Sequence, residues 1–546
     1  MVDSSCMKLP LGHRTFRPIA GQWHSNLRGE VVQGVFRVIS LIYFDARSCS
    51  SIAFVRAKEN VVGRKLCFAA IVLGLSFMDA CAGDWNQWRG SNRDGLAVDS
   101  PRLIGALPAE GLRPVWKSEA IRSGRAGGWG SPVVAEGKVY LFAHERVQLR
   151  EPGKKKYPWL APEKRTGMSA EEYAEYEVNR RNEDEAHAKA YQFRELVYCL
   201  DGRTGGTLWK NEADSLYSRF PQSGSATVMG DRLYILGAGL HARCLDAQTG
   251  NEIWSQRLEG EFRDEFFQSS IAIAEGVVVL MCQGLIGLDV ATGKPLWTGD
   301  AKALRGSHSS PVVWKHEGRE LIVVNVASGR TACVDPRSGE ELWRVASAAG
   351  VSTPLIVGNR LLTYGNSRKG GLRCFEMSAE GATPVWEFHG TADKGSSPVA
   401  VGESVFVQGE RKLACVSLET GRAEWSTTLD LSRPQYTSLI AADGKVFYAL
   451  EGLLCFNASR EGFEPLIEAK MDAAGLMAPE SVFRARLGLD ALEKEPGGLE
   501  ESVRLLQKTI GRAGPVACVT PAIAGGRLYL RVSDGIVCYD LRAVGE

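Results

Sequence analysis

The stretch Cys244–Trp254, which runs CLDAQTGNEIW, decides the fold because versions of it recur along the whole chain. It joins a short Cys-x-Asp strand to a Thr-Gly turn and then to a strand that carries tryptophan. Two further strand signals precede it in each copy: a Ser-Pro strand, and after a glycine turn a β-branched or aromatic strand such as Arg232–Leu236. Alternating apolar positions between glycine-containing turns predict a four-stranded antiparallel meander.

The first copy starts at Pro132, and its steps to later copies set the repeat length. Equivalent positions are Ala226, Ile271, Pro311, Pro354, Pro398, Leu439 and Pro521. The middle steps are 45, 40, 43, 44 and 41 residues, whereas the outer steps of 94 and 82 residues each hold an insertion. A four-stranded unit of this length, present eight times, indicates an all-β, eight-bladed β-propeller.

The two ends of the chain complement each other. The last copy contains Val537–Asp540 but lacks a tryptophan strand before Glu546. An unmatched tryptophan strand, Arg113–Lys117, lies before the first copy and resembles Thr383–Glu387. We therefore expect the N-terminal strand to complete blade eight and close the ring, which leaves few exposed sheet edges.

The side chains that recur once per copy have structural explanations. One tryptophan on each outer strand is expected to pack blade against blade rather than to stack a ligand. Those tryptophans are Trp116, Trp209, Trp254, Trp297, Trp343, Trp386 and Trp425, with Ile467 in the seventh copy. An aspartate before the Thr-Gly turn can accept hydrogen bonds from turn amides. It occurs as Asp201, Asp246, Asp289, Asp335 and Asp540.

Seven cysteines share one position of the repeat: Cys199, Cys244, Cys333, Cys374, Cys415, Cys455 and Cys538. Packed sheets lie ~10 Å apart, which exceeds the ~7 Å Cα separation that a disulfide tolerates. We expect buried free thiols at these positions. Cys282 and Cys518 lie outside the pattern, and pairing between them stays open.

The N-terminal region has the composition of an export signal. Arg64 and Lys65 precede an apolar run, Leu66–Phe77, and Ala80-Cys81-Ala82 follows it. This order is typical of a secretory signal peptide, and the run is shorter than the ~20 residues of a membrane span. We expect residues 1–60 to be a misassigned or disordered leader, 61–82 the signal peptide, 83–110 an N-terminal segment and 111–546 the propeller. The stretch Asp79-Ala80-Cys81 is a poor lipobox because it contains an acidic residue, which argues against lipid anchoring at Cys81.

Two insertions interrupt the repeats, at about 144–195 and 470–514. The first contains a capping box, Ser169–Glu172, which opens a charged helix. The second is predicted to end in a helix with one apolar face, formed by Leu499, Val503, Leu506 and Ile510. Both belong to one face of the ring and to neighbouring blades. We expect a shared helical cap beside the axial funnel; the alternative is that each decorates its own blade.

Polar and aromatic residues that precede the first strands are the predicted binding site, since such groups would converge on the funnel. They are Arg125, Trp129, Gln268, Ser269, His308, Ser309, Gln435 and Tyr436, with Gln222 and Ser396 in equivalent places. The alternative is that the serines and glutamines satisfy the ends of inner strands. No catalytic residue and no metal ligand is predicted, and a net charge of +1 gives no footprint for nucleic acid.

The repeat Cys-x-Asp-x-x-Thr-Gly-x-x-x-Trp resembles the tryptophan docking motif of the pyrroloquinoline-quinone (PQQ) propeller superfamily. The likeness covers roughly residues 84–546, and the stretch Asp84–Gly95 is similar to the mature start of secreted PQQ-like proteins. The resemblance implies one of two classes. One is the quinoprotein dehydrogenases, which hold PQQ and calcium on the axis. The other is cofactor-free scaffold propellers of the outer-membrane assembly lipoprotein type.

Departures from the dehydrogenase pattern favour the scaffold class. No Cys-Cys dipeptide is present, and the catalytic aspartate and calcium ligands of that class find no counterpart; the pair Asp264-Glu265 is expected in a solvated loop. We expect an exported, monomeric propeller in the periplasm or cell envelope that binds a protein or extracellular ligand without a cofactor. The alternatives are a PQQ- and calcium-dependent dehydrogenase of alcohols or sugars, and a propeller that binds or processes carbohydrate.

Overall fold

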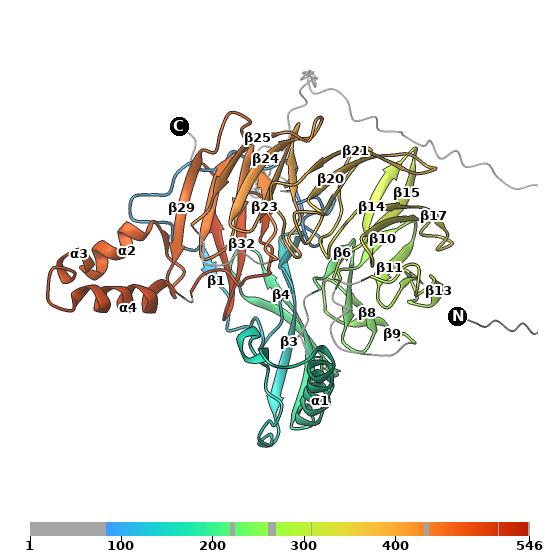
Figure 1. Cartoon of the computed structure of the whole chain (residues 1–546), viewed down its shortest axis with the longest axis horizontal. Coiled ribbons are helices and arrows are strands. Elements are labelled where there is room, and N and C mark those ends of the chain that lie inside the picture. The colour runs from blue at the N-terminus through green and yellow to red at the C-terminus, as the bar shows by residue number, and fades with distance from the viewer. Residues whose placement is uncertain are drawn as a thin grey trace, which may run out of the picture. The chain divides into compact units, whose positions relative to one another are not determined.

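The computed structural model describes residues 83–218, 224–259, 269–306, 308–430, 436–511 and 513–543. The expected leader, signal peptide and Cys81 lie outside these residues. Eight antiparallel sheets follow one another around a central axis (Figure 1). The eight-bladed propeller that the repeat predicts is confirmed. Within the described residues, no helix has both the length and the apolar character that crossing a bilayer requires.

Each blade runs from the axis outward. Blades one and two contain β2 (Val133–Ala135), β3 (Lys138–Gln148), β4 (Tyr191–Asp201), β5 (Thr207–Ser215), then β6 (Thr227–Met229), β7 (Arg232–Gly237), β8 (His241–Asp246), β9 (Glu252–Arg257). Blades three and four contain β10 (Ala272–Ala274), β11 (Val277–Met281), β12 (Leu285–Asp289), β13 (Pro295–Thr298), then β14 (Val312–His316), β15 (Arg319–Val326), β16 (Arg330–Val334), β17 (Glu341–Ala346).

The second half of the ring continues in the same order. Blades five and six contain β18 (Leu355–Val357), β19 (Arg360–Tyr364), β20 (Leu372–Met377), β21 (Ala382–Phe388), then β22 (Val399–Val401), β23 (Ser404–Gly409), β24 (Lys412–Ser417), β25 (Ala423–Thr428). Blade seven has a fifth, short strand: β26 (Ile440–Ala442), β27 (Lys445–Tyr448), β28 (Leu453–Asn457), β29 (Pro465–Met471), β30 (Met477–Ala478). Blade eight contains β31 (Ala522–Ala524), β32 (Arg527–Val532), β33 (Gly535–Asp540) and β1 (Trp116–Lys117).

The ring closes through its two ends. Strand β1 pairs antiparallel with β33, so that Trp116 lies opposite Cys538 and Lys117 opposite Val537. Blade eight is therefore built from residues more than 400 positions apart, as the split repeat predicts.

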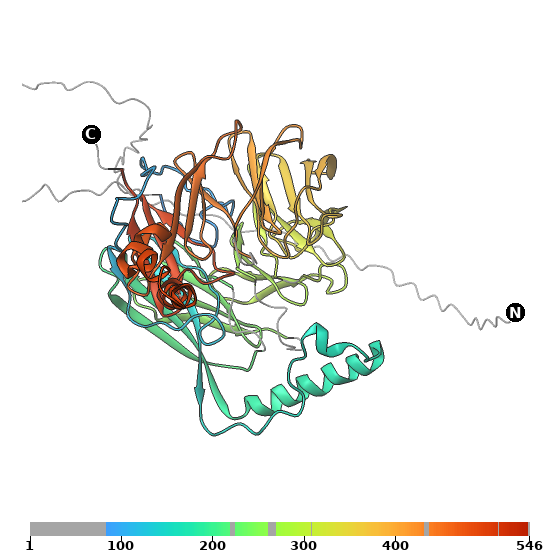
Figure 2. The same ribbon diagram turned by 60° about the vertical axis from the view of Figure 1, so that its left-hand side comes forward.

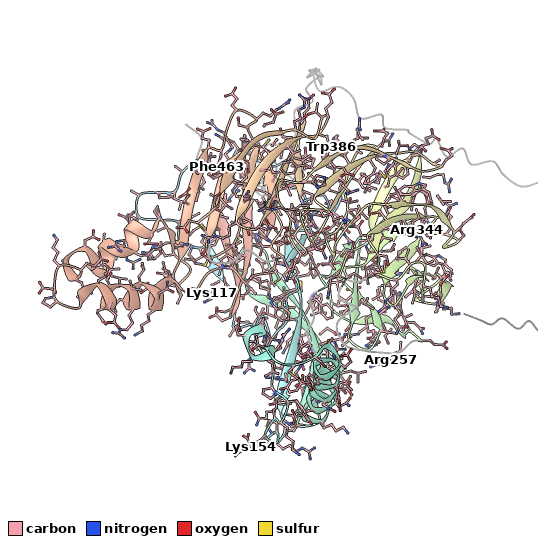
Figure 3. All side chains as sticks on the ribbon, in the orientation of Figure 1. Lys117, Lys154, Arg257, Arg344, Trp386 and Phe463 are labelled. Atoms are coloured by element: carbon pink, nitrogen blue, oxygen red, sulfur yellow. The ribbon has the colours of Figure 1, made fainter. Side chains whose placement is uncertain are left out.

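The repeated tryptophans join neighbouring blades. Each indole Nε1 donates to a backbone carbonyl of the following blade at 2.7–3.2 Å, from Trp116, Trp209, Trp254, Trp297, Trp343, Trp386 and Trp425. Trp386 is labelled on β21 in Figure 3. The indole of Trp209 also covers Gly250, where φ is +73° and a Cβ would lie 2.5 Å from the ring. The tryptophan and the turn glycine are thus two halves of one blade-to-blade contact.

Hydroxyl groups form a second circumferential contact, at the start of the inner strands. Seven backbone N–H groups donate at 2.8–3.0 Å to a serine or threonine oxygen of the next blade, in a series that runs from Thr520 to Ser438. In ring order the residues are Thr520, Ser131, Ser225, Ser270, Ser310, Thr353, Ser397 and Ser438. The serine of the Ser-Pro repeat is therefore explained by packing around the ring.

Cysteines at the repeat position are buried and free. Cys282 is likewise a buried free thiol, and Cys518 is a partly buried one, so the two do not pair with each other in the structure.

The insertions form two separate projections. Strands β3 and β4 extend beyond the ring and carry a 3₁₀ turn (Pro162–Arg165) and helix α1 (Ala170–Ala188), whose capping box at Ser169 is present. Between blades seven and eight lie α2 (Glu480–Leu487), α3 (Leu489–Leu492) and α4 (Gly498–Ile510). Figures 1 and 2 show α1 and the α2–α4 group apart, so the expectation of one shared cap was wrong. Each insertion projects from its own part of the ring instead.

The expected apolar face of α4 is only half used. Ile510 is buried and Leu506 packs beside it against Phe483 of α2. Leu499 and Val503 are 65% and 55% exposed, whereas Gly498 and Ser502 in the same half of the helix are buried and Ser502 donates to Glu493. In that half the helix turns a different side toward its neighbours than the one the sequence pattern indicates.

Candidate binding site at the axis

The N-terminal segment enters the centre of the ring. We call residues 84–97 the axial plug. Trp85 exchanges both of its backbone hydrogen bonds with Val134 of β2, each at 2.8 Å. The carbonyl of Asn86 accepts from the N–H of Val228 on β6 at 2.8 Å. At its other end the plug pairs with Ala441 of β26, whose N–H donates to Gly95. The plug is thus a strand-like addition to the inner edges of three blades.

Two buried arginines fix the middle of the plug. Arg93 donates to the carbonyls of Ser270, Pro311 and Ile271 at 2.6–3.2 Å, and to the side-chain oxygen of Gln87. Burial lowers the pKa of Arg93 to about 9, so the guanidinium remains charged at neutral pH. The guanidinium of Arg93 is therefore held by backbone carbonyls of blades three and four, where a carboxylate would be the usual partner.

Arg89 is the second buried arginine of the plug. Its Nη2 donates to the carbonyls of Asp94 and Pro398, whereas its Nε and Nη1 have no hydrogen-bond partner. Burial lowers its pKa to about 10, an effect that nearby Asp94 partly offsets. Gly95 permits this close approach, because a Cβ there would lie 2.9 Å from the guanidinium.

Hydrogen bonds of the plug reach seven blades. Trp88 Nε1 donates to the hydroxyl of Thr520 in blade eight at 3.2 Å. Together with the contacts of Trp85, Asn86, Arg93, Arg89 and Gly95, this connects the plug to blades one, two, three, four, six, seven and eight. Blade five has no such bond within the described residues. The plug therefore leaves open space on that side of the axis.

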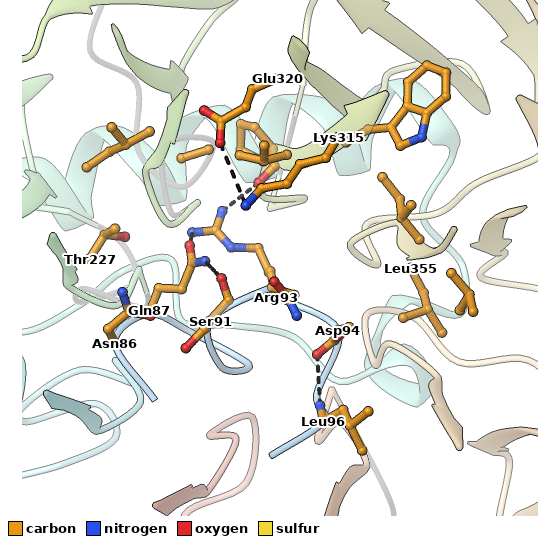
Figure 4. Close-up of a pocket in the computed structure, with 18 of the residues that line it drawn as sticks. Asn86, Gln87, Ser91, Arg93, Asp94, Leu96, Thr227, Lys315, Glu320 and Leu355 are labelled. Atoms are coloured by element: carbon orange, nitrogen blue, oxygen red, sulfur yellow. Dashed lines mark hydrogen bonds and ion pairs between the residues drawn. The ribbon is translucent and has the colours of Figure 1, made fainter. Parts of the chain in front are cut away.

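A cavity of about 610 Å³ occupies this space (Figure 4). Its floor is the plug, including Gln87, Ser91, Arg93 and Asp94. Its walls are the inner strands β6, β10, β14, β18 and β22 of blades two to six. The rim includes turn residues Gly358 and Gly402, which join first and second strands. The cavity therefore opens at the end of the axis where the first strands finish.

Charge in the cavity is nearly balanced. Lys315 reaches Glu320 at 3.9 Å on the rim, and Figure 4 shows this pair above Arg93. Burial raises the pKa of Asp94, although the N–H of Leu96 donates to its carboxylate. Trp314, which is 1% exposed, has an indole Nε1 without a hydrogen-bond partner. The site combines an apolar wall with charged groups that are already engaged and one unpaired indole N–H, that of Trp314.

The cavity does not fit a calcium-bound quinone. Calcium takes six to eight oxygen ligands, carboxylates above all. The two acidic residues of the cavity are Asp94, whose burial disfavours the charged form, and Glu320, which is engaged with Lys315 and accepts from the N–H of Glu275. No group of three or more potential metal ligands gathers within the described residues.

The residues predicted from the sequence precede the first strands, at the opposite end of these strands from the cavity. Arg125 and His308 are exposed, Tyr436 is 36% exposed and Trp129 is partly buried. Ser269 is buried, and its hydroxyl donates to the carbonyl of Met281 at 2.9 Å, as the alternative explanation expects.

The remaining predicted positions divide into two groups. Ser309 and Ser396 are buried, and their hydroxyl oxygens lack a hydrogen-bond partner. Gln222, Gln268 and Gln435 lie outside the described residues. None of the described candidates lines the cavity. The plug was the feature that sequence reasoning missed, because two arginines among turn residues have the composition of a solvated loop.

Comparisons with known proteins agree with this architecture. A family model described as "Outer membrane protein assembly factor BamB" matches residues 194–427 and 287–470. The chain is 24% identical over 223 residues to a protein of that name from Burkholderia pseudomallei (strain K96243); the match covers 37% of this chain and 54% of the relative. The chain thus spans about half the length of the curated relative it matches.

A solved structure supports the same fold, and a second is given for comparison. A quinohemoprotein alcohol dehydrogenase from Comamonas testosteroni superposes with a TM-score of 0.50 at 11% identity, covering 85% of this chain and 81% of that one. BamB from Moraxella catarrhalis gives a TM-score of 0.44 at 16% identity, covering 64% and 90%. The fold, the repeat and the family match define one class: PQQ-like β-propellers. Within that class, the chain belongs to the family described as outer membrane protein assembly factor BamB.

Proposed function

We propose that the chain is an exported binding propeller, which holds a protein partner in the cell envelope and uses no redox cofactor. The observation that carries this proposal is the axial plug. The chain fills one end of its own axis with residues 84–97, and the space that remains is lined by strand edges and apolar side chains. Such a cavity suits recognition better than charge-assisted binding of a polyanionic quinone.

The family supports a protein partner. The matching relative from Burkholderia pseudomallei is described as an outer membrane protein assembly factor, a description that implies action on other proteins. Fold does not determine function, and the dehydrogenase neighbour is 11% identical. Its likeness therefore supports the propeller and not the chemistry.

A cofactor titration tests the proposal. The purified chain is titrated with PQQ in the presence of calcium, followed by absorbance and by tryptophan fluorescence. A dye-reduction assay with alcohols and sugars runs beside it, and an authentic PQQ dehydrogenase is the positive control. We expect neither saturable binding at micromolar quinone nor dye reduction. Tight one-to-one binding with substrate-dependent dye reduction would overturn the proposal in favour of the dehydrogenase.

A further inference from the structure

The inner strands present one equivalent residue each to the axis. In blade one this residue is Val134, whose N–H and C=O both bond to Trp85 of the plug. Its neighbours Val133 and Ala135 use theirs within the blade, since backbone bonds alternate sides along an antiparallel strand. The same register recurs in every blade. The equivalent residues are Val228, Ile273, Val313, Ile356, Ala400, Ala441 and Ile523.

Within the described residues the plug uses three of these eight positions; of the other five, four line the cavity and Ile523 does not. Val134, Val228 and Ala441 bond to plug backbone and are at most 5% exposed. Ile273, Val313, Ile356 and Ala400 have no backbone bond to the plug within the described residues, and all four line the cavity. The cavity wall is therefore a set of sheet edges that await pairing, and unpaired strand edges are templates for another chain.

Strand β14 is the longest of these edges. Its five residues, against three in β10, β18 and β22, place two residues toward the axis, Val313 and Lys315. Both line the cavity. Two axis-facing residues offer two N–H donors and two C=O acceptors, which is enough for a short antiparallel or parallel pairing.

We propose that the cavity binds an extended peptide segment of the partner protein, which adds as a strand to the axial edge of β14. Strand addition of this kind draws its affinity from backbone hydrogen bonds and its selectivity from side-chain pockets. This proposal rests on the proposed binding function and names the chemistry of its partner. The plug itself is the argument for a peptide, because an extended segment already occupies the equivalent edges of blades one, two and seven.

The surroundings of β14 define what the peptide carries. Val313, Ile356 and Val357 are partly exposed in the cavity wall, so an apolar side chain on the peptide is accommodated. The Lys315–Glu320 pair on the rim presents one charge of each sign. Length is limited to roughly four to six residues, because β14 spans five residues at about 3.3 Å each.

The test uses proline to remove the axis-facing donors alone. A Val313→Pro/Lys315→Pro variant lacks both N–H groups, yet their loss leaves the bonds between β14 and β15 intact, and proline is tolerated on edge strands. The matched control, Val313→Ala/Lys315→Ala, keeps the backbone donors and shortens the side chains. Circular dichroism and thermal melting check that each variant folds. The probe is a random 12-residue peptide library displayed on phage, selected on the full chain.

We expect enriched peptides to bind the proline variant at least tenfold more weakly than the alanine control, as the loss of two backbone hydrogen bonds implies. Both variants lose the side chains of Val313 and Lys315, so the comparison between them isolates the backbone donors. Equal binding to the proline variant would overturn edge pairing, and so would the absence of any enriched peptide. Either failure leaves the cofactor titration unaffected, so the two proposals fail separately. Should the proline variant not fold, amide exchange of residues 312–316 replaces it: bound peptide must slow exchange there, and unchanged exchange contradicts the proposal.

Discussion

Trp85 anchors the plug, and its removal should release the plug without unfolding the ring. Its side chain is 1% exposed and packs in the core shared by blades one, seven and eight. Replacing a buried tryptophan by alanine typically costs about 3–5 kcal/mol. The ring itself is unchanged by the substitution, and the backbone of residue 85 can still bond to Val134. The lost free energy therefore shifts the equilibrium between the plug bound in the axis and the plug released from it. At about 1.4 kcal/mol per tenfold, the released population of Trp85→Ala rises by at least a hundredfold.

Hydrogen exchange followed by mass spectrometry measures that population. The amides of Val134, Val228 and Ala441 bond to the plug, so their exchange reports its release. We expect exchange in these three segments to accelerate by roughly two orders of magnitude, whereas outer strands stay unchanged. Trp159→Ala is the matched control, because Trp159 is 63% exposed. Exchange within threefold of wild type at all three segments would refute the account of how the plug is held.

Three further predictions concern the ring itself. Gly250→Ala should lower the free energy of unfolding, measured in guanidinium, by about 3 kcal/mol more than Gly230→Ala does. Both glycines have positive φ, but only at Gly250 would a Cβ meet an indole, that of Trp209. Equal decreases in the free energy of unfolding for the two variants would contradict this contact. Burial raises the pKa of Glu195 to about 7. The folded chain therefore keeps the proton of the Glu195 carboxyl over a pH range in which the unfolded chain has released it. The free energy of unfolding should therefore fall by about 3 kcal/mol as the pH rises from about 5 to about 8, and Glu195→Gln should remove this fall. If urea unfolding shows the same change in free energy with pH for the wild-type chain and for Glu195→Gln, the prediction is contradicted. Burial also raises the pKa of the Cys282 thiol to about 12, so iodoacetamide should leave Cys282 unlabelled in the native chain at pH 8, and rapid labelling found by peptide mapping would contradict its placement.

Those parts of the molecule that repeat could be predicted from the sequence. Copies of the Cys-x-Asp-x-x-Thr-Gly-x-x-x-Trp pattern specify strand order, turn type and the contact between each tryptophan and the next blade. The closure by Trp116 could also be predicted, because an incomplete last copy and an unmatched first strand require each other. Repetition supplies several independent examples of one local structure, and for that reason these inferences held.

Features that occur once could not be found in this way. The axial plug has no second copy in the chain. Arg89 and Arg93 donate to backbone carbonyls, and because every residue type has a carbonyl, the sequence does not reveal these partners. The cavity likewise depends on which inner edges the plug leaves unpaired. The direction in which α1 and α4 project depends on packing at the root of each insertion, which periodicity does not encode.

The central claim is that the plug-side mouth of the axis is where a partner protein binds. A photo-crosslinking amino acid at position 315, on the rim of the cavity, tests this claim in cells that naturally produce the chain. The control carries the same amino acid in place of Lys154, which is exposed on the blade-one projection. The account predicts a crosslink from position 315 to one protein, absent from position 154 and lost in a chain with Val313→Pro. Crosslinks of equal yield at both positions, or none at 315 while a partner still co-purifies with the chain, would contradict it.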